Sequence, residues 1–334
     1  MSSRSEPALA PAARRVAERF ARFRAPEGGL FFEALAGHFA HLEDHPVLPL
    51  HFEYAATANE RGERAAERLF ALLPALGRRG VFARRPRVLD VGCAYGGFLV
   101  AFARRGARVT GIDVDPRYVR LAALNLRERG LDGDLVHGDA GEPHPGFSGR
   151  FDLVIANDVL EHVPRPAAFL ANLRDWLTPS GAAWLEIPNG AWPPYVARDG
   201  HHQLFGVTLL DHAEASEYME LKAPGGRYDT YQYLGPDECE RLFREAGLTF
   251  EVLPDAAAAG PAALARVLAE VETLRAAAPS GLAAVPAPLR EKVRERLRNY
   301  LEGIAWAPRR TDEEIRRFLL LYGAPFWTVL ARRR

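Results

Sequence analysis

A glycine-rich turn and a following acidic residue are the groups in this chain whose types and spacing point to chemistry. Residues 88–97 read VLDVGCAYGG, and a second apolar segment ends in GIDVDP, which contains Asp113. A hydrophobic strand that runs into a glycine turn lets the backbone approach a ligand, and an acid at the end of the next strand can accept hydrogen bonds from ribose hydroxyls. The pattern therefore predicts a nucleoside-binding site.

The composition of the turn distinguishes between two nucleoside ligands. It contains Gly92, Cys93, Ala94 and Gly96, and Asp90 stands before it. A nicotinamide dinucleotide site would show G-x-G-x-x-G instead. The early acid and the compressed glycine pattern favour S-adenosylmethionine, which leaves a nicotinamide-dependent dehydrogenase as the weakest alternative.

Strands and helices that alternate from Arg87 onward must position these residues. The pattern predicts strands over 87–92, 107–114, 134–139, 151–158, 182–188, 248–253 and 326–331. The helix after Asp113 has the clearest signals, because Asp115 is placed to cap it, a proline follows at its first position, and Gly130 ends it. Strands separated by helices of this length imply a parallel sheet with right-handed crossovers, and therefore an α/β fold.

The flanking segments suggest how the chain is organised. Residues 1–80 are predicted to be helical and to cap the substrate side, and 81–254 with 325–334 to form the core, which carries an insertion over 188–234. Residues 255–324 are predicted to be a helical insert between the last two strands, with helices over 261–277, 286–303 and from Thr311. This insert could be a lid or a dimer contact, so a homodimer is possible. Aromatic residues of the insertion could line a substrate pocket or form its own small core: Trp192, Tyr195, Phe205, Tyr228, Tyr231 and Tyr233.

The composition excludes several classes of function. Lys plus Arg and Asp plus Glu both number 43, and this zero net charge argues against a protein that binds nucleic acid through a basic face. No apolar run is long enough to span a membrane. Cys93 and Cys239 are too few for a disulfide framework, which is typical of a reducing compartment, so we expect a cytoplasmic protein.

Four motifs together resemble a known family. VLDVGCAYGG, GIDVDP, GDA and FDLVIANDVLEHV, in this order and spacing, resemble class I S-adenosylmethionine-dependent methyltransferases. The small-molecule group that includes ubiquinone-biosynthesis O-methyltransferases is the most similar. The resemblance covers residues 86–190 well and 231–253 loosely. It implies S-adenosylmethionine as the cofactor, and a Rossmann-like, seven-stranded, mostly parallel sheet with an antiparallel last strand.

The resemblance also implies roles on the methionine and ribose side of the cofactor. Gly92, Ala94 and Gly96 would line the turn under the methionine part, with Ala94 where the family usually has glycine. Cys93 would be a small residue within this turn. Asp90 would lie near the cofactor's amino group, and Asp113 would accept hydrogen bonds from both ribose hydroxyls.

Further roles concern the adenine and the methyl group. By resemblance, Val114 would lie against the adenine, and Asp139 with Ala140 would meet its amino edge. Asn157, at the end of the fourth strand, would face the methyl donor. These positions follow the carboxyl ends of parallel strands, where open α/β sheets bind their ligands.

Two histidines are predicted to remove a proton from the acceptor. His162 and His202 are the catalytic candidates, because histidine titrates near the working pH of a general base. Asp158, Glu161 and His162 also resemble a cluster that binds a divalent ion in some related methyltransferases, which would need a further histidine such as His201 or His202. The same sequence occurs widely without metal, and no metal is predicted. His38, His41 and His45 are expected on a solvated helix face or loop.

The predicted reaction is methyl transfer to a small-molecule acceptor, at a hydroxyl of a sugar or secondary-metabolite intermediate. N- or C-methylation would use the same cofactor site. Aminopropyl transfer or another reaction of the same fold, and a non-catalytic protein that binds S-adenosylmethionine, are the alternatives.

Overall fold

The computed structural model describes residues 9–25, 29–75, 85–253 and 260–334. The chain divides into two compact units. The first comprises Met1–Ile155 and Asp175–Ala182, and the second comprises Ala156–Arg174 and Ala183–Arg334. The domain boundaries expected near residues 80, 254 and 324 stay predictions.

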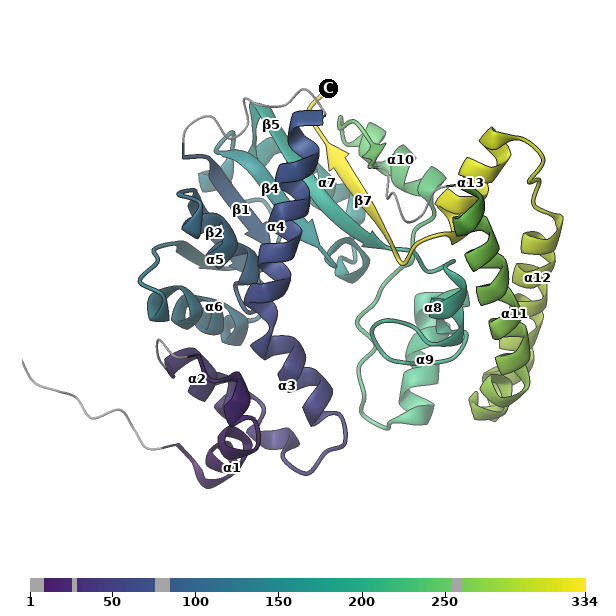
Figure 1. Cartoon of the computed structure of the whole chain (residues 1–334), viewed down its shortest axis with the longest axis horizontal. Helices are drawn as coiled ribbons and strands as arrows, with labels where there is room; N and C mark the ends of the chain where they lie inside the picture. Colours follow the sequence, from purple (N-terminus) through teal and green to yellow (C-terminus); the bar gives the residue numbers. More distant parts are fainter. Residues whose placement is uncertain (1–8, 26–28, 76–84, 254–259) are drawn as a thin grey trace, which may run out of the picture. The chain divides into compact units, whose positions relative to one another are not determined.

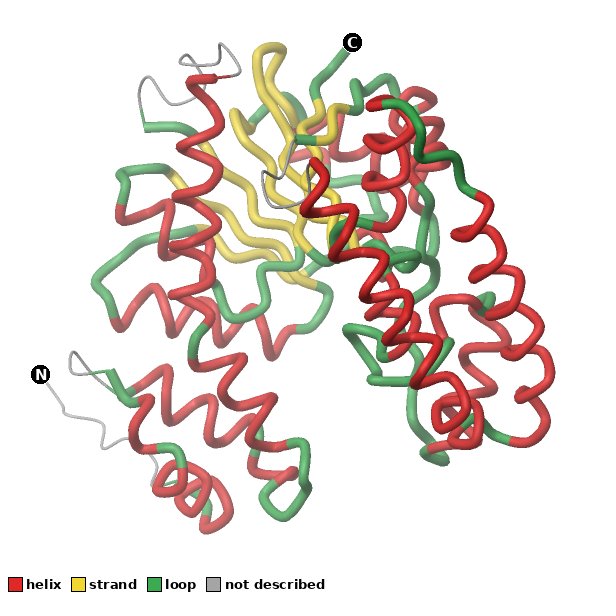
Figure 2. The backbone as a smooth tube through the Cα atoms, turned by 45° about the vertical axis from the view of Figure 1, so that its right-hand side comes forward, coloured by secondary structure: helices red, strands yellow, loops and turns green. Residues whose placement is uncertain are grey.

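Seven strands form one sheet in the order β3-β2-β1-β4-β5-β7-β6, drawn in yellow in Figure 2. They are β1 Arg87–Val91, β2 Arg108–Asp113, β3 Asp134–His137, β4 Phe151–Asn157, β5 Leu177–Pro188, β6 Glu251–Val252 and β7 Phe326–Ala331. β1 pairs in parallel with β2 and β4, and β2 with β3. β7 runs antiparallel to β5 and β6. The predicted fold class, a mostly parallel sheet with an antiparallel last strand, is confirmed.

The sixth predicted strand is shortened most. Of residues 248–253, only Glu251 and Val252 form β6, while Leu248 makes an isolated bridge to Arg333. The backbone N–H of Thr249 still donates to Arg332 O at 2.8 Å. The bridge and β6 therefore pair in the same register with β7 and the residues that follow it. Only the strand pairing between Leu248 and Glu251 is interrupted.

The helices of the first unit build a core around aromatic side chains. They are α1 Pro11–Arg19, α2 Leu30–His38, α3 Leu48–Ala56, α4 Ala58–Ala75, α5 Gly97–Arg104 and α6 Pro116–Glu128, with short 3₁₀ turns at Ala21–Phe23, Ala40–Leu42 and Pro145–Phe147. Phe20 and Phe52 stack with their ring centroids 4.3 Å apart. The same buried cluster includes Tyr95, in the glycine turn, and Leu121, in α6. The N-terminal helices therefore pack on the predicted cofactor turn, as Figure 1 shows for α4 beside α5.

The close approach of α4 and α5 depends on two glycines. A Cβ atom on Gly62 would lie 2.3 Å from the carbonyl oxygen of Gly97. A Cβ atom on Gly97 would lie 2.2 Å from the carbonyl oxygen of Ala58. Both contacts are with backbone atoms, so glycine is required on each side of the crossing.

The second unit is largely helical outside its strands. Its elements are the 3₁₀ turns Leu160–His162 (η4) and Val207–Leu209 (η5), with α8 Pro193–Ala197, α9 His212–Lys222, α10 Pro236–Glu245, α11 Gly260–Ala284, α12 Ala287–Trp306 and α13 Asp312–Tyr322. α7, Pro166–Trp176, begins in this unit. The helices predicted over 261–277 and 286–303 are present, and both are longer than expected. The first of them, α11, continues through Pro279.

Two aromatic residues of the 188–234 insertion belong to a small apolar core, which is one of the two roles left open by the sequence, and the substrate-pocket role stays a prediction. Phe205 and Tyr228 are buried in a cluster with Leu274 of α11 and Leu289 of α12. Trp192 and Tyr233 instead direct polar groups toward other side chains, with Trp192 Nε1 donating to Glu270 at 3.1 Å. No helix in the described parts of the chain combines the length and apolar composition needed to cross a membrane.

Candidate functional site

The glycine turn after β1 has a left-handed backbone at three positions. The φ angles of Gly92, Ala94 and Gly96 are 66°, 42° and 75°. Glycine adopts such angles without a steric penalty, whereas alanine is strained there. Ala94 nonetheless adopts this left-handed conformation, so three positions of the turn share it.

The turn lies directly on β2. Cys93 is buried, and a Cβ atom on Gly111 of β2 would lie 2.9 Å from its Sγ atom. Burial raises the pKa of the Cys93 thiol, so the side chain stays protonated. Cys93 therefore acts as a small packing residue.

Asp113, at the end of β2, holds the turn through its carboxylate. Its Oδ2 atom accepts the backbone N–H of Ala94 at 2.9 Å, and its Oδ1 atom accepts the N–H of Asp115 at 2.9 Å. Burial raises the pKa of Asp113 despite these hydrogen bonds. Each carboxylate oxygen keeps a second lone pair, which ribose hydroxyls can use.

Asp90 is a buried acid in the same place. Its Oδ2 atom has no hydrogen-bond partner among the described residues. Burial, reinforced by the negative charge of Asp113, holds the pKa of Asp90 well above its ordinary value. A buried acceptor of this kind fits a ligand that brings hydrogen-bond donors or positive charge, such as the cofactor's amino group.

The residues expected around the adenine are accessible. Val114 is 69% exposed although its side chain is apolar, so an aromatic ring could cover it. Asp139 is exposed and its Oδ1 atom accepts the N–H of Gly141 at 2.7 Å, while Ala140 beside it is half-buried. Together with Asp90 and Asp113, these features fit an S-adenosyl group, which presents an amine, ribose hydroxyls and an adenine.

Sequence reasoning missed a residue that supports this turn. Asn125, on α6, is fully buried, and its Nδ2 atom donates to the carbonyl oxygen of Tyr95 at 2.6 Å. An asparagine within an apolar helix face is the signal that could have revealed it. Asp115 caps α6 as predicted, by accepting the N–H of Arg117.

In the second unit, Asn157 is tied to the neighbouring strand. Its Nδ2 atom donates to Oε2 of Glu186, on β5, at 3.1 Å. Its Oδ1 atom is buried and has no hydrogen-bond partner in the described residues. The predicted contact of Asn157 with the methyl donor stays a prediction.

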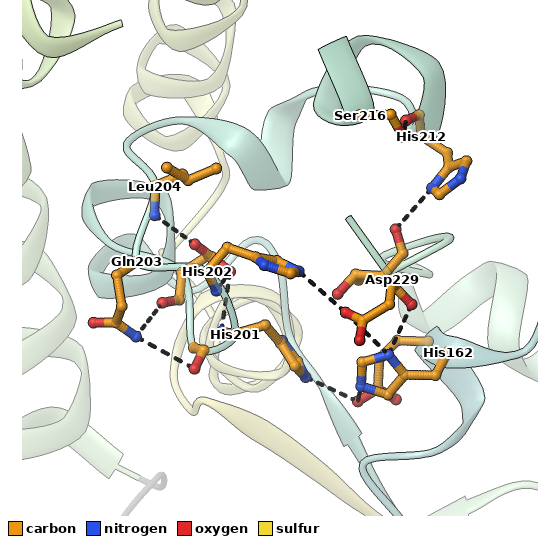
Figure 3. Close-up of polar contacts among 12 residues, drawn as sticks. His162, His201, His202, Gln203, Leu204, His212, Ser216 and Asp229 are labelled. Carbon is orange, nitrogen blue, oxygen red and sulfur yellow. Dashed lines mark hydrogen bonds and ion pairs between the residues drawn. The ribbon is translucent and has the colours of Figure 1, made fainter. Parts of the chain in front are cut away.

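A cluster of histidines and acids lies at η4 and in the 188–234 insertion. Figure 3 shows His162, His201, His202 and Asp229 pointing toward one another. Glu161 is only 2% exposed, and its Oε1 atom lies 3.3 Å from Nε2 of His201 and 3.6 Å from Nε2 of His162. The cluster therefore joins one of the two predicted catalytic histidines to a buried carboxyl.

The other ring nitrogens of these histidines face further groups. Nδ1 of His162 lies 2.8 Å from the carbonyl oxygen of Asp229, and Nδ1 of His201 lies 3.1 Å from the hydroxyl of Tyr233. Nε2 of His202 lies 3.2 Å from Oδ1 of Asp229. The imidazoles of His162 and His201 are thus each oriented by a specific partner.

Asp199 organises the loop that carries two of the histidines. It is fully buried, and its carboxylate accepts the backbone N–H groups of His201, His202 and Leu204 at 3.0, 2.8 and 2.6 Å. Sequence reasoning missed Asp199, although an aspartate shortly before a turn often accepts the following N–H groups. It missed Asp229 and Tyr233 as partners of the histidines as well.

The electrostatics of the cluster suit proton transfer or cation binding. Burial raises the pKa of Glu161 to about 7 and lowers that of His201. The neighbouring His202 lowers the pKa of Asp229 to about 2. Glu161, His162 and His201 could hold a metal ion, since their ligand atoms all lie within 4.8 Å of one another. Asp158, which the sequence places beside them, is not in this group and has a left-handed φ of 53°.

The other histidines are only partly as expected. His41 and His45 are exposed. His38 is half-buried, with its ring centroid 4.7 Å from Phe39 and 5.7 Å from Tyr118, and burial lowers its pKa. The expectation of a solvated face is wrong for His38, because α2 packs on α6.

Known proteins are similar to this chain in sequence. The family described as a methyltransferase domain matches residues 54–252. A ubiquinone biosynthesis O-methyltransferase from Aromatoleum aromaticum is 34% identical over 168 residues, which cover 50% of this chain and 66% of that protein. Another, from Thiobacillus denitrificans, is 35% identical over 170 residues, with coverages of 50% and 66%. The chain thus spans slightly less than two thirds of these relatives' length.

A solved structure is also similar. Magnesium protoporphyrin IX methyltransferase from Synechocystis PCC 6803 is 19% identical, with a TM-score of 0.40, over 59% of this chain and 78% of that chain. The family match itself covers more than half of the chain. The chain therefore belongs to the methyltransferase-domain family, among the class I S-adenosylmethionine-dependent methyltransferases.

Proposed function

We propose that this protein transfers the methyl group of S-adenosylmethionine to a hydroxyl oxygen of a small molecule. The observation that carries the proposal is the glycine turn with its two buried acids, Asp90 and Asp113, and the uncovered Val114, in a chain of the methyltransferase-domain family. When bound, the cofactor supplies a methyl group on a positively charged sulfur, which leaves as a neutral thioether.

The chain's own residues must then bind the cofactor, orient the acceptor and remove the proton from its hydroxyl. Asp113 would accept the ribose hydroxyls, and Asp90 would lie near the amino group. His202 would take the proton of the acceptor hydroxyl, with Asp229 holding its imidazole from the Nε2 side at 3.2 Å. His162 is the second candidate for this base. Correct placement of the reactants can lower the barrier by about 7–11 kcal/mol, and a base adds about 10²–10⁴-fold.

The acceptor class remains part of the proposal. Sugars and secondary-metabolite intermediates with free hydroxyls are the acceptors that we expect. The name of the relatives assigns them O-methylation in ubiquinone biosynthesis, so hydroxyls of quinone precursors belong in the same test. N- and C-methylation are the alternatives, since they would use the same cofactor site.

The test is incubation of the purified chain with S-adenosylmethionine labelled in its methyl group and a panel of these acceptors. Mass spectrometry of the product locates the label on oxygen, nitrogen or carbon. Label on oxygen, with S-adenosylhomocysteine formed in equal amount, supports the proposal. Cofactor binding without turnover on any class of acceptor would favour the non-catalytic alternative, and labelled nitrogen or carbon would correct the acceptor atom.

A further inference from the structure

We propose that a cavity between the loop after His202 and α11 binds a small organic oxyanion, which is a carboxylate or a phosphate monoester on an apolar body. The cavity has a volume of about 250 Å³ and lies within the second unit. Its walls come from the end of α8, the loop after His202, α9 and α11. Sites for drug-sized ligands have volumes of about 300–1,000 Å³, so the occupant of this cavity is small.

Two cations at this cavity lack acidic partners. Arg198 and Lys222 line it, and neither makes an ion pair with any residue that the structure describes. The Nζ atom of Lys222 donates to the carbonyl oxygen of Ala284 at 3.3 Å, which holds the ammonium beside α11. Lys292, on α12, pairs with Glu214 at 2.8 Å instead. None of the described residues that line the cavity is acidic, so its positive charge is left for an anion.

A buried hydroxyl offers a third polar contact. Tyr218, on α9, lines the cavity although it is only 1% exposed, and its hydroxyl makes no hydrogen bond within the described parts of the chain. Burial, reinforced by the negative charge of Asp199, raises the pKa of Tyr218 to about 12, so the phenol stays protonated and can donate. A buried donor without a partner is costly, and an oxyanion in the cavity would satisfy it.

The other walls define the body of the ligand. Leu204, Phe205 and Ala277 give the cavity an apolar surface, which favours a hydrocarbon or aromatic body over an inorganic ion. The guanidinium of Arg198 has the planar fork that matches a carboxylate or a phosphate. Benzoate, hexanoate and phenyl phosphate each combine an oxyanion with a small apolar body, and they are therefore suitable probes.

An occupant would contact residues that directly follow His201 and His202. Gln203 lines the cavity with a left-handed φ of 60°, which is unfavourable for a residue other than glycine. Its Nε2 atom donates to the carbonyl oxygen of Asp199 at 2.8 Å, and Figure 3 shows its side chain turned away from the imidazole of His202. A bound anion would stabilise this conformation of the loop and the positions of both histidines. This regulatory role rests on the proposed function, whereas the binding site does not.

The experiment titrates the full chain with benzoate, hexanoate or phenyl phosphate by calorimetry, without S-adenosylmethionine and in a buffer free of other carboxylates and phosphates. Benzamide is the neutral counterpart of benzoate. We expect one or more of the anions to bind at least about 10-fold more tightly than benzamide. Binding should weaken as the salt concentration rises, because the two cations are exposed. Comparison of benzoate with phenyl phosphate separates carboxylate from phosphate ligands.

Conservative variants locate the site. Arg198→Gln and Lys222→Met should each weaken binding of the anion about 5–10-fold, and Tyr218→Phe about 3–10-fold, because each removes one hydrogen-bond donor. Arg227→Gln is the matched control, since Arg227 is an exposed cation of the same insertion outside the cavity. This variant should bind the anion like the wild type.

Hydrogen exchange supplies a measurement that needs no variant. A bound anion should slow exchange at the N–H groups of His201, His202 and Leu204, which donate to the Asp199 carboxylate. Unchanged exchange with the anion bound would overturn the effect on the loop.

Three results would overturn the binding site itself. They are no binding of any of the three anions at about 10 mM, binding of benzamide as tight as that of benzoate, or an affinity loss in Arg227→Gln equal to that in Lys222→Met. Because no cofactor is present, these outcomes are independent of methyl transfer, so failure of this site and failure of the proposed function are separate results.

Discussion

Replacing Gly62 by alanine tests whether α4 is docked on the cofactor turn. The new Cβ atom would lie 2.3 Å from the carbonyl oxygen and 2.4 Å from the carbonyl carbon of Gly97, and 2.8 Å from the backbone nitrogen of Phe98. Ordinary contacts begin at 3.4 Å, so α4 and α5 must separate by about 1 Å. Because all three atoms are backbone, no change of rotamer can relieve the overlap.

The energetic balance of Gly62→Ala has a definite sign. Overpacking of this kind costs about 1–3 kcal/mol. Alanine in a helix interior recovers about 0.5–1 kcal/mol relative to glycine. We therefore expect a net destabilisation of up to about 2.5 kcal/mol, measured by urea unfolding followed by circular dichroism. Gly303→Ala in α12 is the matched control, because its Cβ atom meets nothing within 4 Å, and it should stabilise the protein by about 0.5–1 kcal/mol.

The same variant should weaken cofactor binding. Gly97 follows Gly96 directly, so a displaced α5 also moves the turn whose Ala94 N–H bonds to Asp113. Calorimetry with S-adenosylhomocysteine should show lower affinity for Gly62→Ala and unchanged affinity for Gly303→Ala. If Gly62→Ala is as stable as Gly303→Ala and binds S-adenosylhomocysteine normally, the close crossing of α4 and α5 is wrong.

Three further changes test the cofactor and catalytic residues. Asp113→Ala should weaken S-adenosylhomocysteine binding about 100-fold by calorimetry, since it removes two hydrogen bonds to a charged group, and unchanged affinity would contradict the assigned role. His202→Ala should lower kcat by about 10²–10⁴-fold while cofactor affinity stays constant, and normal turnover would show that His202 is not the base. Asp90→Asn should stabilise the cofactor-free protein at neutral pH: the folded-state pKa of Asp90 lies well above its ordinary value of 3.8, so ionisation favours unfolding. That gain in urea stability should fade as the pH falls toward 3.8, and a constant gain would refute the raised pKa.

The cofactor turn could be predicted from sequence because its determinants are local. Gly92, Ala94 and Gly96 lie within one turn, and Asp113 ends the next strand, so strand pairing alone brings them together. The capping of α6 by Asp115 is likewise read from adjacent residues. The support from Asn125 is different, because it depends on how α6 packs against the turn.

The histidine cluster could not be predicted as a unit from sequence, because it too depends on how distant segments of the chain pack together. Glu161 and His162 precede α7, His201 lies in the insertion, and Asp229 and Tyr233 lie after α9. Their contacts depend on loop conformations fixed by long-range hydrogen bonds, such as Tyr231 N–H to Glu161 O. The sequence predicted the residue types of a possible metal site, but it could not decide between His201 and His202 or exclude Asp158.

The long helical insert between β6 and β7 positions the loop that carries His201 and His202. This role differs from the lid or dimer contact that the sequence suggested. The loop after His202 packs on α11 and α12, since Cβ atoms on Gly206 and Gly281 would lie 2.6 Å from Val293 and 2.2 Å from Phe205. Leu204 and Phe205 are buried in one cluster with residues of both helices. Asp199 binds the N–H groups of His201, His202 and Leu204 together. The Asp199 carboxylate therefore links Leu204, which packs on the insert, to the backbone of the two histidines. In this way the insert holds the loop that carries His201 and His202.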